Sequence, residues 1–264
     1  MPSHHARIAR ELIDAAAEVT VLTGAGISTD SGIPDFRGPE GVWTKDPAAE
    51  RASDIRYYKR DPELRRINWA RRAEGALWAD VEPNVGHRAL VHLERRGKLH
   101  TLITQNVDEL HQLAGSDPAK VVEVHGTTRK AACLSCGWRT EMHIVLDRVR
   151  AGEEDPDCPR CSGVLKSATV SFGQSLDPED LRRSEQAASE ADVFLAVGTS
   201  LAVYPINETV RIAKEAGARI IIINAQPTVF DDIADAVMHE QISDALPYVV
   251  GMSDDAGAIG DGNS

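Results

Sequence analysis

Short runs of apolar residues recur along this chain and are separated by longer segments with a helical pattern. The first run, VTVLTGAG at 19–26, has the profile of a buried strand followed by a tight turn. Further runs lie at 99–103, 121–124, 168–172, 192–197 and 219–223, with a weaker one at 236–238. Helices are predicted between them, over 4–18, 83–96, 107–114, 178–190 and 205–217.

Strands that alternate with helices predict an α/β fold with an open parallel sheet and helices on both faces. The run IIII at 220–223 supports this fold, because a strand that is covered on both faces need not alternate apolar and polar residues. We therefore expect most of the chain to form one domain around such a sheet.

Two segments interrupt the alternation. Residues 39–80 carry Arg, Trp, Tyr and Ala at helical spacing and are predicted to form a small helical insert, whereas residues 128–167 form a second insert that holds all four cysteines. The sheet domain would then comprise 1–38, 81–127 and 168–252. The acidic, glycine-rich segment 253–264 is expected to be a disordered tail.

Charge and composition narrow the classes of function. The 264 residues carry a formal net charge of −12, which disfavours a nucleic acid as the main ligand, although the cluster Arg65, Arg66, Arg71 and Arg72 could meet an acidic group of a substrate. The chain shows neither the apolar core of a signal peptide nor a run long enough to span a membrane, so we expect a cytoplasmic protein.

The four cysteines form two CxxC pairs, Cys133 with Cys136 and Cys158 with Cys161, separated by 21 residues. Each CxxC turn can supply two thiolates, and two such turns complete a closed tetrahedral zinc site with no open coordination position. The alternative is a pair of disulfides or a redox motif. The spacing favours a structural zinc, but a zinc site of this kind does not reveal the function.

The first predicted strand runs into GAGISTDSGIPDFRG at 24–38. Gly24 and Gly26 allow the backbone to approach a pyrophosphate, and a helix that starts there would add its positive end. The usual dinucleotide fingerprint needs a third glycine where this chain has Thr29, and no acidic residue ends a second strand about 20 residues further on. By itself the turn fits a nucleotide site or an ordinary strand–turn–helix.

Several motifs together resemble the sirtuin family. GAGISTDSGIPDFRG, TQNVDELH (104–111), EVHGT (123–127), the paired CxxC, GTS (198–200) and IIN (222–224) occur in sirtuin order, over about residues 7–250. The resemblance implies an NAD-dependent protein lysine deacylase, of the bacterial or archaeal type. NAD would lie between a Rossmann-like domain and a small domain made of the zinc and helical inserts. The products would be nicotinamide, free lysine and O-acyl-ADP-ribose.

The same resemblance assigns the chemistry. His125 follows a strand end and is suited to take a proton from a ribose hydroxyl, because the unperturbed pKa of imidazole lies near the working pH. Asn106 and Asp108, with Gln105, would hold the nicotinamide amide and ribose. His87 matches the family but is expected to be structural. The remaining predicted NAD contacts are Gly24, Ala25, Gly26, Ile27, Ser28, Ile33, Asp35, Phe36, Arg37, Gly198, Thr199, Ser200, Asn224, Gln226 and Ile242.

On the substrate side, the family binds the acyl-lysine peptide as an added strand between two loops, here 170–174 with Val170, Phe172 and Gly173, and 201–205. Relatives that remove acidic acyl groups carry Tyr-x-x-Arg in the helical insert, and the matching positions here are Trp69 and Arg72. An indole N–H could replace the phenol, and Arg72 could meet a carboxylate, or it could be one more solvated arginine of this helix.

Deacetylation is the default expectation. The alternatives are removal of acidic acyl groups through Arg72, mono-ADP-ribosylation of protein in the same NAD cleft, and a zinc-ribbon adaptor that senses NAD without turnover. Acyl-lysine proteins are the expected partners, and the oligomeric state is left open.

Overall fold

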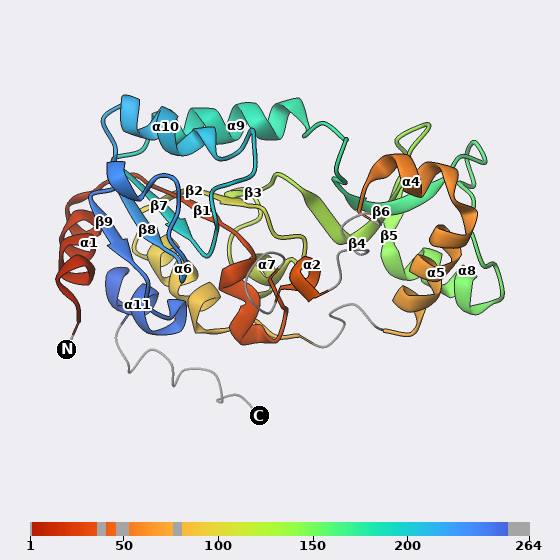
Figure 1. Cartoon of the computed structure of the whole chain (residues 1–264), viewed down its shortest axis with the longest axis horizontal. Coiled ribbons are helices and arrows are strands. Elements are labelled where there is room, and N and C mark those ends of the chain that lie inside the picture. Colours follow the sequence, from red (N-terminus) through yellow and green to blue (C-terminus); the bar gives the residue numbers. More distant parts are fainter. Residues whose placement is uncertain (1, 36–40, 46–52, 76–80, 253–264) are drawn as a thin grey trace.

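The computed structural model describes residues 2–35, 41–45, 53–75 and 81–252. A larger lobe contains a six-stranded parallel sheet, and a smaller lobe contains a three-stranded antiparallel sheet (Figure 1). The strands of the larger sheet lie in the order β3 (Val121–Glu123), β2 (Leu99–Thr104), β1 (Val19–Thr23), β7 (Val193–Val197), β8 (Arg219–Ile223) and β9 (Ala236–Met238). The predicted parallel α/β sheet is confirmed.

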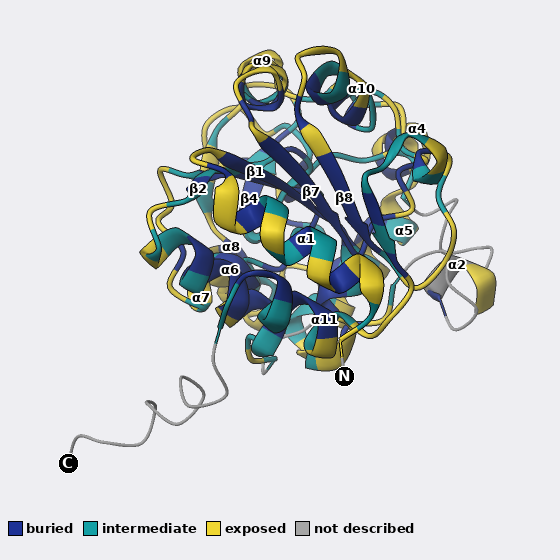
Figure 2. Cartoon of the chain, turned by 90° about the vertical axis from the view of Figure 1, so that its left-hand side faces the viewer, coloured by how far each residue is buried: buried dark blue, intermediate teal, exposed yellow. Residues whose placement is uncertain are grey.

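Helices cover both faces of this sheet (Figure 2). On one face α1 (His4–Ala15), α6 (Val85–Arg95) and α11 (Ile242–Val249) enclose an apolar core, and on the other face α9 (Pro178–Ser189) and α10 (Glu208–Glu215) enclose a second one. All five residues of β1 and of β7 are buried, which explains why these strands carry no polar alternation. Two short 3₁₀ helices, η1 (Ala25–Ser31) and η2 (Asp231–Ile233), and the helix α7 (Leu110–Leu113) complete this lobe.

The smaller lobe brings together elements from two separate parts of the chain. Its sheet consists of β5 (Arg139–Glu141), β4 (Gly126–Cys133) and β6 (Leu165–Thr169), and α8 (Met142–Arg150) packs against α5 (Pro62–Ala73). The helices α2 (Val42–Lys45) and α4 (Ile55–Arg60) precede α5. Asp61 starts α5 by accepting hydrogen bonds from the amides of Glu63 and Leu64, with Pro62 at the first helical position.

Two predictions about these elements were wrong or inaccurate. The run 168–172 does not join the parallel sheet: the strand is β6, it ends at Thr169, and it pairs antiparallel with β4. The reason is that β4 starts directly after His125, and the chain returns along it after the cysteine loops. The predicted helix 107–114 shrinks to Leu110–Leu113, because Glu109 has a left-handed backbone with φ of 60°. The helix predicted at the turn after β1 is present as the 3₁₀ helix η1.

Candidate active site

A cavity of about 1090 Å³ lies at the carboxyl ends of the parallel strands, between the two lobes. Open α/β sheets bind ligands where the strand order reverses, and here the chain runs outward in one direction from β1 and in the other from β7. The loops after β1 and β7 meet at this point. A Cβ atom on Gly26 would lie 2.7 Å from the Cα atom of Gly198, so the close approach of the two loops requires glycine.

The fold brings most of the predicted site residues together around this cavity. Those that line it follow the ends of six strands or lie on α5 and at the start of α11: Gly24, Ala25, Gly26, Ser28, Ile33, Asp35, Arg72, Gln105, Asn106, Asp108, His125, Val170, Phe172, Gly173, Gly198, Thr199, Ser200, Asn224, Gln226 and Ile242. Residues that are up to about two hundred positions apart in the sequence therefore share one space.

Two predicted residues point elsewhere. The side chain of Ile27 is 1% exposed and packs in the core beneath the sheet, and Trp69, also 1% exposed, packs in the core of the small lobe with Val145 and Leu165. Neither lines the cavity. The tryptophan at the Tyr-x-x-Arg position thus turns toward α8 and the cysteine loops instead of the cavity. Phe36 and Arg37 lie outside the described residues.

His125 lies between β3 and β4, at the edge of the cavity. Its Nδ1 atom is 3.0 Å from the carbonyl oxygen of Gln105. Because a carbonyl can only accept, Nδ1 carries the hydrogen, and the basic nitrogen of the neutral ring is Nε2. The next residue must be glycine: Gly126 has φ of +70°, and a Cβ atom there would lie 2.0 Å from the carbonyl oxygen of Ala168.

Asn106 and Asp108, after the end of β2, are held by a set of buried hydrogen bonds. Asn106 Nδ2 donates to Gly24 O (3.2 Å) and to Ser28 Oγ (3.1 Å), which uses both amide hydrogens. Ser28 Oγ donates to Asp108 Oδ2 at 2.8 Å, and the amide of Leu110 donates to Asp108 Oδ1 at 3.0 Å. Burial raises the pKa of Asp108, and these two hydrogen bonds oppose that rise. We call Asn106, Asp108 and His125 the strand-end wall of the cavity.

The opposite side of the cavity, contributed by the small lobe, is positively charged. Arg72 Nη2 donates to Ser167 Oγ at 3.3 Å, and Lys166 Nζ donates to Thr169 O at 2.7 Å and to Thr169 Oγ1 at 3.0 Å. Neither cation has a carboxylate partner in the described part of the chain. Burial lowers the pKa of Arg72. It also lowers the pKa of Lys166 to about 7, and the nearby Arg72 adds to this effect. We call Arg72 and Lys166 the cationic wall.

One of the two predicted peptide loops is already paired on one edge. The amide of Phe172 donates to Ser53 O, and the amide of Ile55 donates to Phe172 O, both at 3.0 Å. An added peptide strand would therefore have to use the other edge of 170–174. Gln174 closes this loop by accepting a hydrogen bond from the amide of Ser171 at 2.9 Å.

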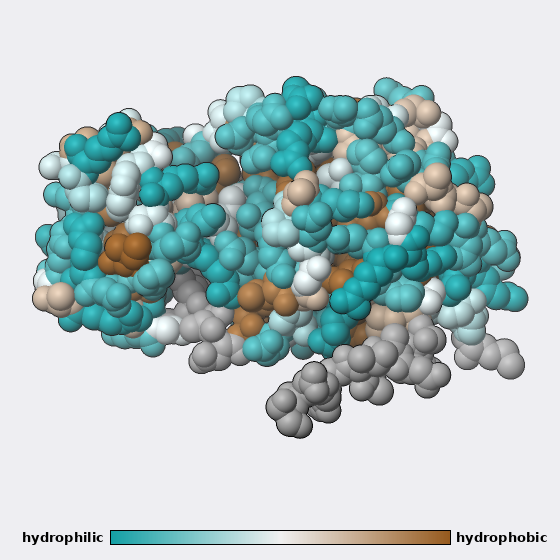
Figure 3. Space-filling model, turned by 180° about the vertical axis from the view of Figure 1, so that it is seen from behind, coloured by the Kyte–Doolittle hydropathy of each residue, from teal (hydrophilic) through white to brown (hydrophobic). Residues whose placement is uncertain are grey.

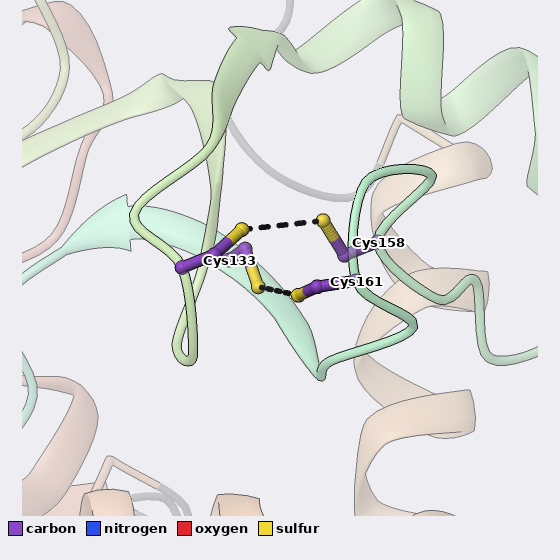
Figure 4. A group of neighbouring side chains, drawn as sticks. Cys133, Cys158 and Cys161 are labelled. Carbon is purple, nitrogen blue, oxygen red and sulfur yellow. Dashed lines mark hydrogen bonds between the residues drawn. The ribbon is translucent and has the colours of Figure 1, made fainter.

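The four cysteine sulfurs converge from the β4–β5 turn and from the loop before β6 (Figure 4). They all lie within 4.8 Å of one another, with Cys133–Cys161 at 3.5 Å and Cys136–Cys158 at 3.8 Å. A tetrahedron with zinc–sulfur bonds of about 2.3 Å has edges of about 3.8 Å, so the cluster fits a structural zinc. The site is separate from the cavity.

Hydrophilic side chains predominate over both lobes on the face shown in Figure 3. In the described ranges, none of the helices combines the length and the apolar character of a membrane span.

The cavity is also lined by five residues that no sequence motif indicated: Tyr58, Asn68, Lys166, Ser167 and Thr169. The only available signal was a lysine inside the otherwise apolar and small-residue run VLKSATV. His111, Thr23 and Thr104, which lie behind the strand-end wall, were missed as well.

Comparison with known proteins agrees with this geometry. The model of the Sir2 family matches residues 24–205. The NAD-dependent protein deacetylase 2 of Streptomyces coelicolor is 52% identical over 232 residues, which cover 88% of this chain and 96% of the relative. A structure solved in a study of the mechanism and regulation of Sir2 enzymes superimposes on this chain with a TM-score of 0.83. The two are 39% identical, and the match covers 94% of this chain and 96% of the other. A Sir2 protein solved with a deacetylated p53 peptide and 3'-O-acetyl ADP-ribose gives a TM-score of 0.83 at 32% identity, covering 93% and 97%.

Proposed function

Because the chain belongs to the Sir2 family of NAD-dependent protein deacetylases, we propose that the cavity between its lobes is the active site and that the strand-end wall carries the reaction. The enzyme uses NAD as a co-substrate and yields deacetylated peptide and O-acetyl-ADP-ribose. In our proposal the segments 1–38, 81–127 and 168–252 hold NAD, and the inserts 39–80 and 128–167 form the small domain that receives the acyl group.

Asn106 and Asp108 bind the nicotinamide amide and the adjacent ribose. Since both amide hydrogens of Asn106 are already used, only its Oδ1 atom can meet a ligand, and the carboxylate of Asp108 can likewise only accept. NAD supplies a nicotinamide–ribose bond whose cleavage develops positive charge on the sugar. A wall that offers only acceptors and a negative charge suits a group that donates hydrogen bonds and becomes cationic.

His125 acts as the general base toward a ribose hydroxyl. Its Nδ1–H is fixed on Gln105 O, so Nε2 is the nitrogen that can receive a proton.

The other predicted NAD contacts are assigned by their positions around the cavity. The glycine turn at Gly24 to Ser28 and the segment Gly198 to Ser200 would meet the phosphates, Asn224 and Gln226 the adenosine ribose, and Ile242 the adenine. Ile33, Asp35, Phe36 and Arg37 would enclose the nicotinamide and its ribose.

The acyl-lysine peptide binds between the loops 170–174 and 201–205. Val203, Tyr204 and Pro205 line the same cavity as Phe172 and Gly173, which supports a peptide strand between the two loops. Sir2 proteins have been solved with acetylated peptide, in agreement with this partner class.

The convergence of His125, Asn106 and Asp108 on one cavity at the strand-order reversal is the observation on which this proposal depends. The test is mass spectrometry of the products formed from NAD and an acetyl-lysine peptide by the wild type, His125→Ala and the control His100→Ala. We expect O-acetyl-ADP-ribose from the wild type and the control, and a loss of at least about 100-fold in His125→Ala. ADP-ribose on protein, or NAD binding without nicotinamide release, would instead indicate a transferase or a sensor.

A second candidate activity, removal of acidic acyl groups, is favoured by the cationic wall. Lys166 is 5% exposed and lies beside Arg72 at the inner side of the cavity. Buried cations without a carboxylate partner are costly unless a ligand supplies the anion, and the terminal carboxylate of a succinyl-lysine would do so. The buried position of Trp69 removes the indole from this role, so Arg72 and Lys166 would act without it.

This second activity is tested by comparing acetyl- and succinyl-lysine peptides. We expect Arg72→Met to lower kcat/KM for the succinyl peptide about tenfold or more and to leave the acetyl peptide within about threefold. Arg71→Met, which changes an exposed neighbour on the same helix, is the matched control. Equal losses for both peptides would contradict acidic acyl recognition.

A further inference from the structure

Behind the strand-end wall lies a buried chain of hydrogen bonds that the proposed reaction does not use. It links His111 of α7 with Thr23 at the end of β1 and Thr104 at the end of β2 (His111 Nε2 to Thr23 Oγ1, 2.9 Å; Thr23 Oγ1 to Thr104 Oγ1, 2.9 Å). Thr104 Oγ1 then accepts from the backbone amide of Asn106 at 3.1 Å. All three side chains are at most 2% exposed.

The direction of these bonds fixes the state of the histidine. The hydroxyl hydrogen of Thr23 is given to Thr104, so Thr23 must accept from His111, and Nε2 of His111 carries the hydrogen. Nδ1 of His111 is buried without a partner in the described residues. A hydrogen there would be unsatisfied, and the ring of His87 lies only 4.9 Å away between centroids. Burial accordingly lowers the pKa of His111 well below its usual value, and the ring is neutral.

His87 makes a similar contact with a second hydroxyl, that of Ser28. Its Nδ1 accepts from the backbone amide of Asn84 at 3.3 Å, so its Nε2 carries the hydrogen and faces Ser28 Oγ at 3.5 Å. Ser28 in turn donates to Asp108. Two neutral imidazoles therefore donate into two hydroxyl chains, one that ends at the backbone of Asn106 and one that ends at the carboxylate of Asp108.

We propose that His111 is a positioning residue for cleavage of the nicotinamide–ribose bond, acting through Thr23 and Thr104 on the backbone of Asn106. The inference depends on the role proposed above for Asn106. Its physical basis is that Asn106 follows β2 in a loop, where a free amide would let the side chain shift. Because His111 donates to Thr23 Oγ1, the hydroxyl hydrogen of Thr23 points to Thr104 Oγ1. This hydrogen bond holds the Thr104 oxygen where it accepts from the amide of Asn106.

The experiment measures nicotinamide release with acetyl-lysine peptide for His111→Leu, His111→Gln and Thr23→Val. His111→Leu removes the donor, and Thr23→Val breaks the next link, so both should lower kcat about tenfold while KM for NAD changes less than about threefold. His111→Gln can still donate from its amide and should recover most of kcat. Because both disruptive changes break one chain, the double variant should lose no more than about what either single variant loses.

Thr20→Val is the matched control, since Thr20 is also buried on β1 but its hydroxyl donates to Ala187 O, away from the cavity. It should keep the wild-type kcat, and the melting temperature and zinc content of each variant show whether it folds. Wild-type kcat in both His111→Leu and Thr23→Val, equal losses in His111→Gln and His111→Leu, or additive losses in the double variant would overturn the role of His111. Failure of the wild type to release nicotinamide would instead overturn the proposed function.

Discussion

The two walls of the cavity are built on opposite principles. The strand-end wall presents acceptors, and its polar groups are already held by Ser28, Gly24 and backbone amides before any ligand arrives. The cationic wall presents donors, and its two positive charges find only hydroxyl and carbonyl oxygens among the described residues.

This difference indicates that the two walls have different roles in the reaction and in substrate selection. Side chains that are already held by hydrogen bonds cannot rearrange cheaply, and electrostatic stabilisation of a transition state requires groups fixed in this way. A wall with unpaired buried charge is stabilised by an incoming anion, which is what selection among substrates requires. The strand-end wall thus suits the reaction common to the family, and the cationic wall suits the choice of acyl group.

Removing zinc should separate the two walls most completely. The cationic wall is carried by α5 and β6, which pack around the cysteine loops, whereas the strand-end wall belongs to the large sheet. Chelation should therefore abolish deacylation and raise hydrogen exchange in 126–167, with the parallel sheet still protected. Restoring zinc is the control. Full activity of the zinc-free protein would show that the small lobe does not need the metal.

Asp108→Asn should break the strand-end wall alone. The substitution keeps the shape but removes the negative charge and adds donors, so nicotinamide release should fall about 100-fold. Asp117→Asn, which changes an exposed carboxyl before β3 and away from the cavity, should have no effect on the rate. If Asp108→Asn released nicotinamide at the wild-type rate, the charge of this wall would have no part in cleavage.

The acyl preference should depend on pH through Lys166. Because its pKa is lowered to about 7, Lys166 is positive at lower pH and becomes neutral as pH rises through that value. The ratio of kcat/KM for succinyl- over acetyl-lysine should therefore fall severalfold between about pH 6 and about pH 8. Lys166→Met should give a low ratio that is nearly independent of pH. An unchanged ratio in the wild type would mean that Lys166 does not contact the acyl group.

The smallest expected effect comes from a partly buried carboxyl at the end of β3. Glu123, two residues before His125, has a buried Oε1 without a partner in the described structure. Burial, followed by the nearby carboxyl of Glu109, raises its pKa from 4.5 to about 7. Ionising Glu123 in the folded protein therefore lowers the free energy of unfolding. This destabilisation is absent below the unfolded pKa of 4.5 and complete above about pH 7.

Glu123→Gln should therefore stabilise the protein by about 1 kcal/mol at pH 8, after allowance for the water that reaches this half-buried group, and by less at pH 5. Urea unfolding at both values measures the difference. Glu185→Gln, which changes an exposed residue, is the control and should show no such pH dependence. A gain of equal size at both values would assign the effect to something other than charge.

Much of this arrangement could be predicted from the sequence. Alternating strands and helices predicted the parallel sheet, and two CxxC turns predicted the zinc site. Motifs at strand ends predicted that residues such as Gly24, Asn106, His125 and Gly198 would share a site, because parallel strands all present their carboxyl ends at one edge. These features depend on local pattern and on a general rule of topology.

Side-chain direction could not be predicted in the same way. Trp69 lies three residues from Arg72 on one helix, yet it packs into the small-lobe core while Arg72 faces the cavity. The run 168–172 looked like another parallel strand until its partner proved to be β4. In both cases the outcome depends on which neighbour packs against the segment, and the segment itself does not contain that information.

Spacing along the chain was enough to predict the fold class, the cysteine cluster and most of the residues that face the cavity. It could not predict that His111 is joined to Thr23, 88 residues away, or that Lys166 stands beside Arg72. The physical reason is that a hydrogen-bond direction or an unpaired charge is a property of several groups at contact distance, and contact distance is set only when the separate elements pack.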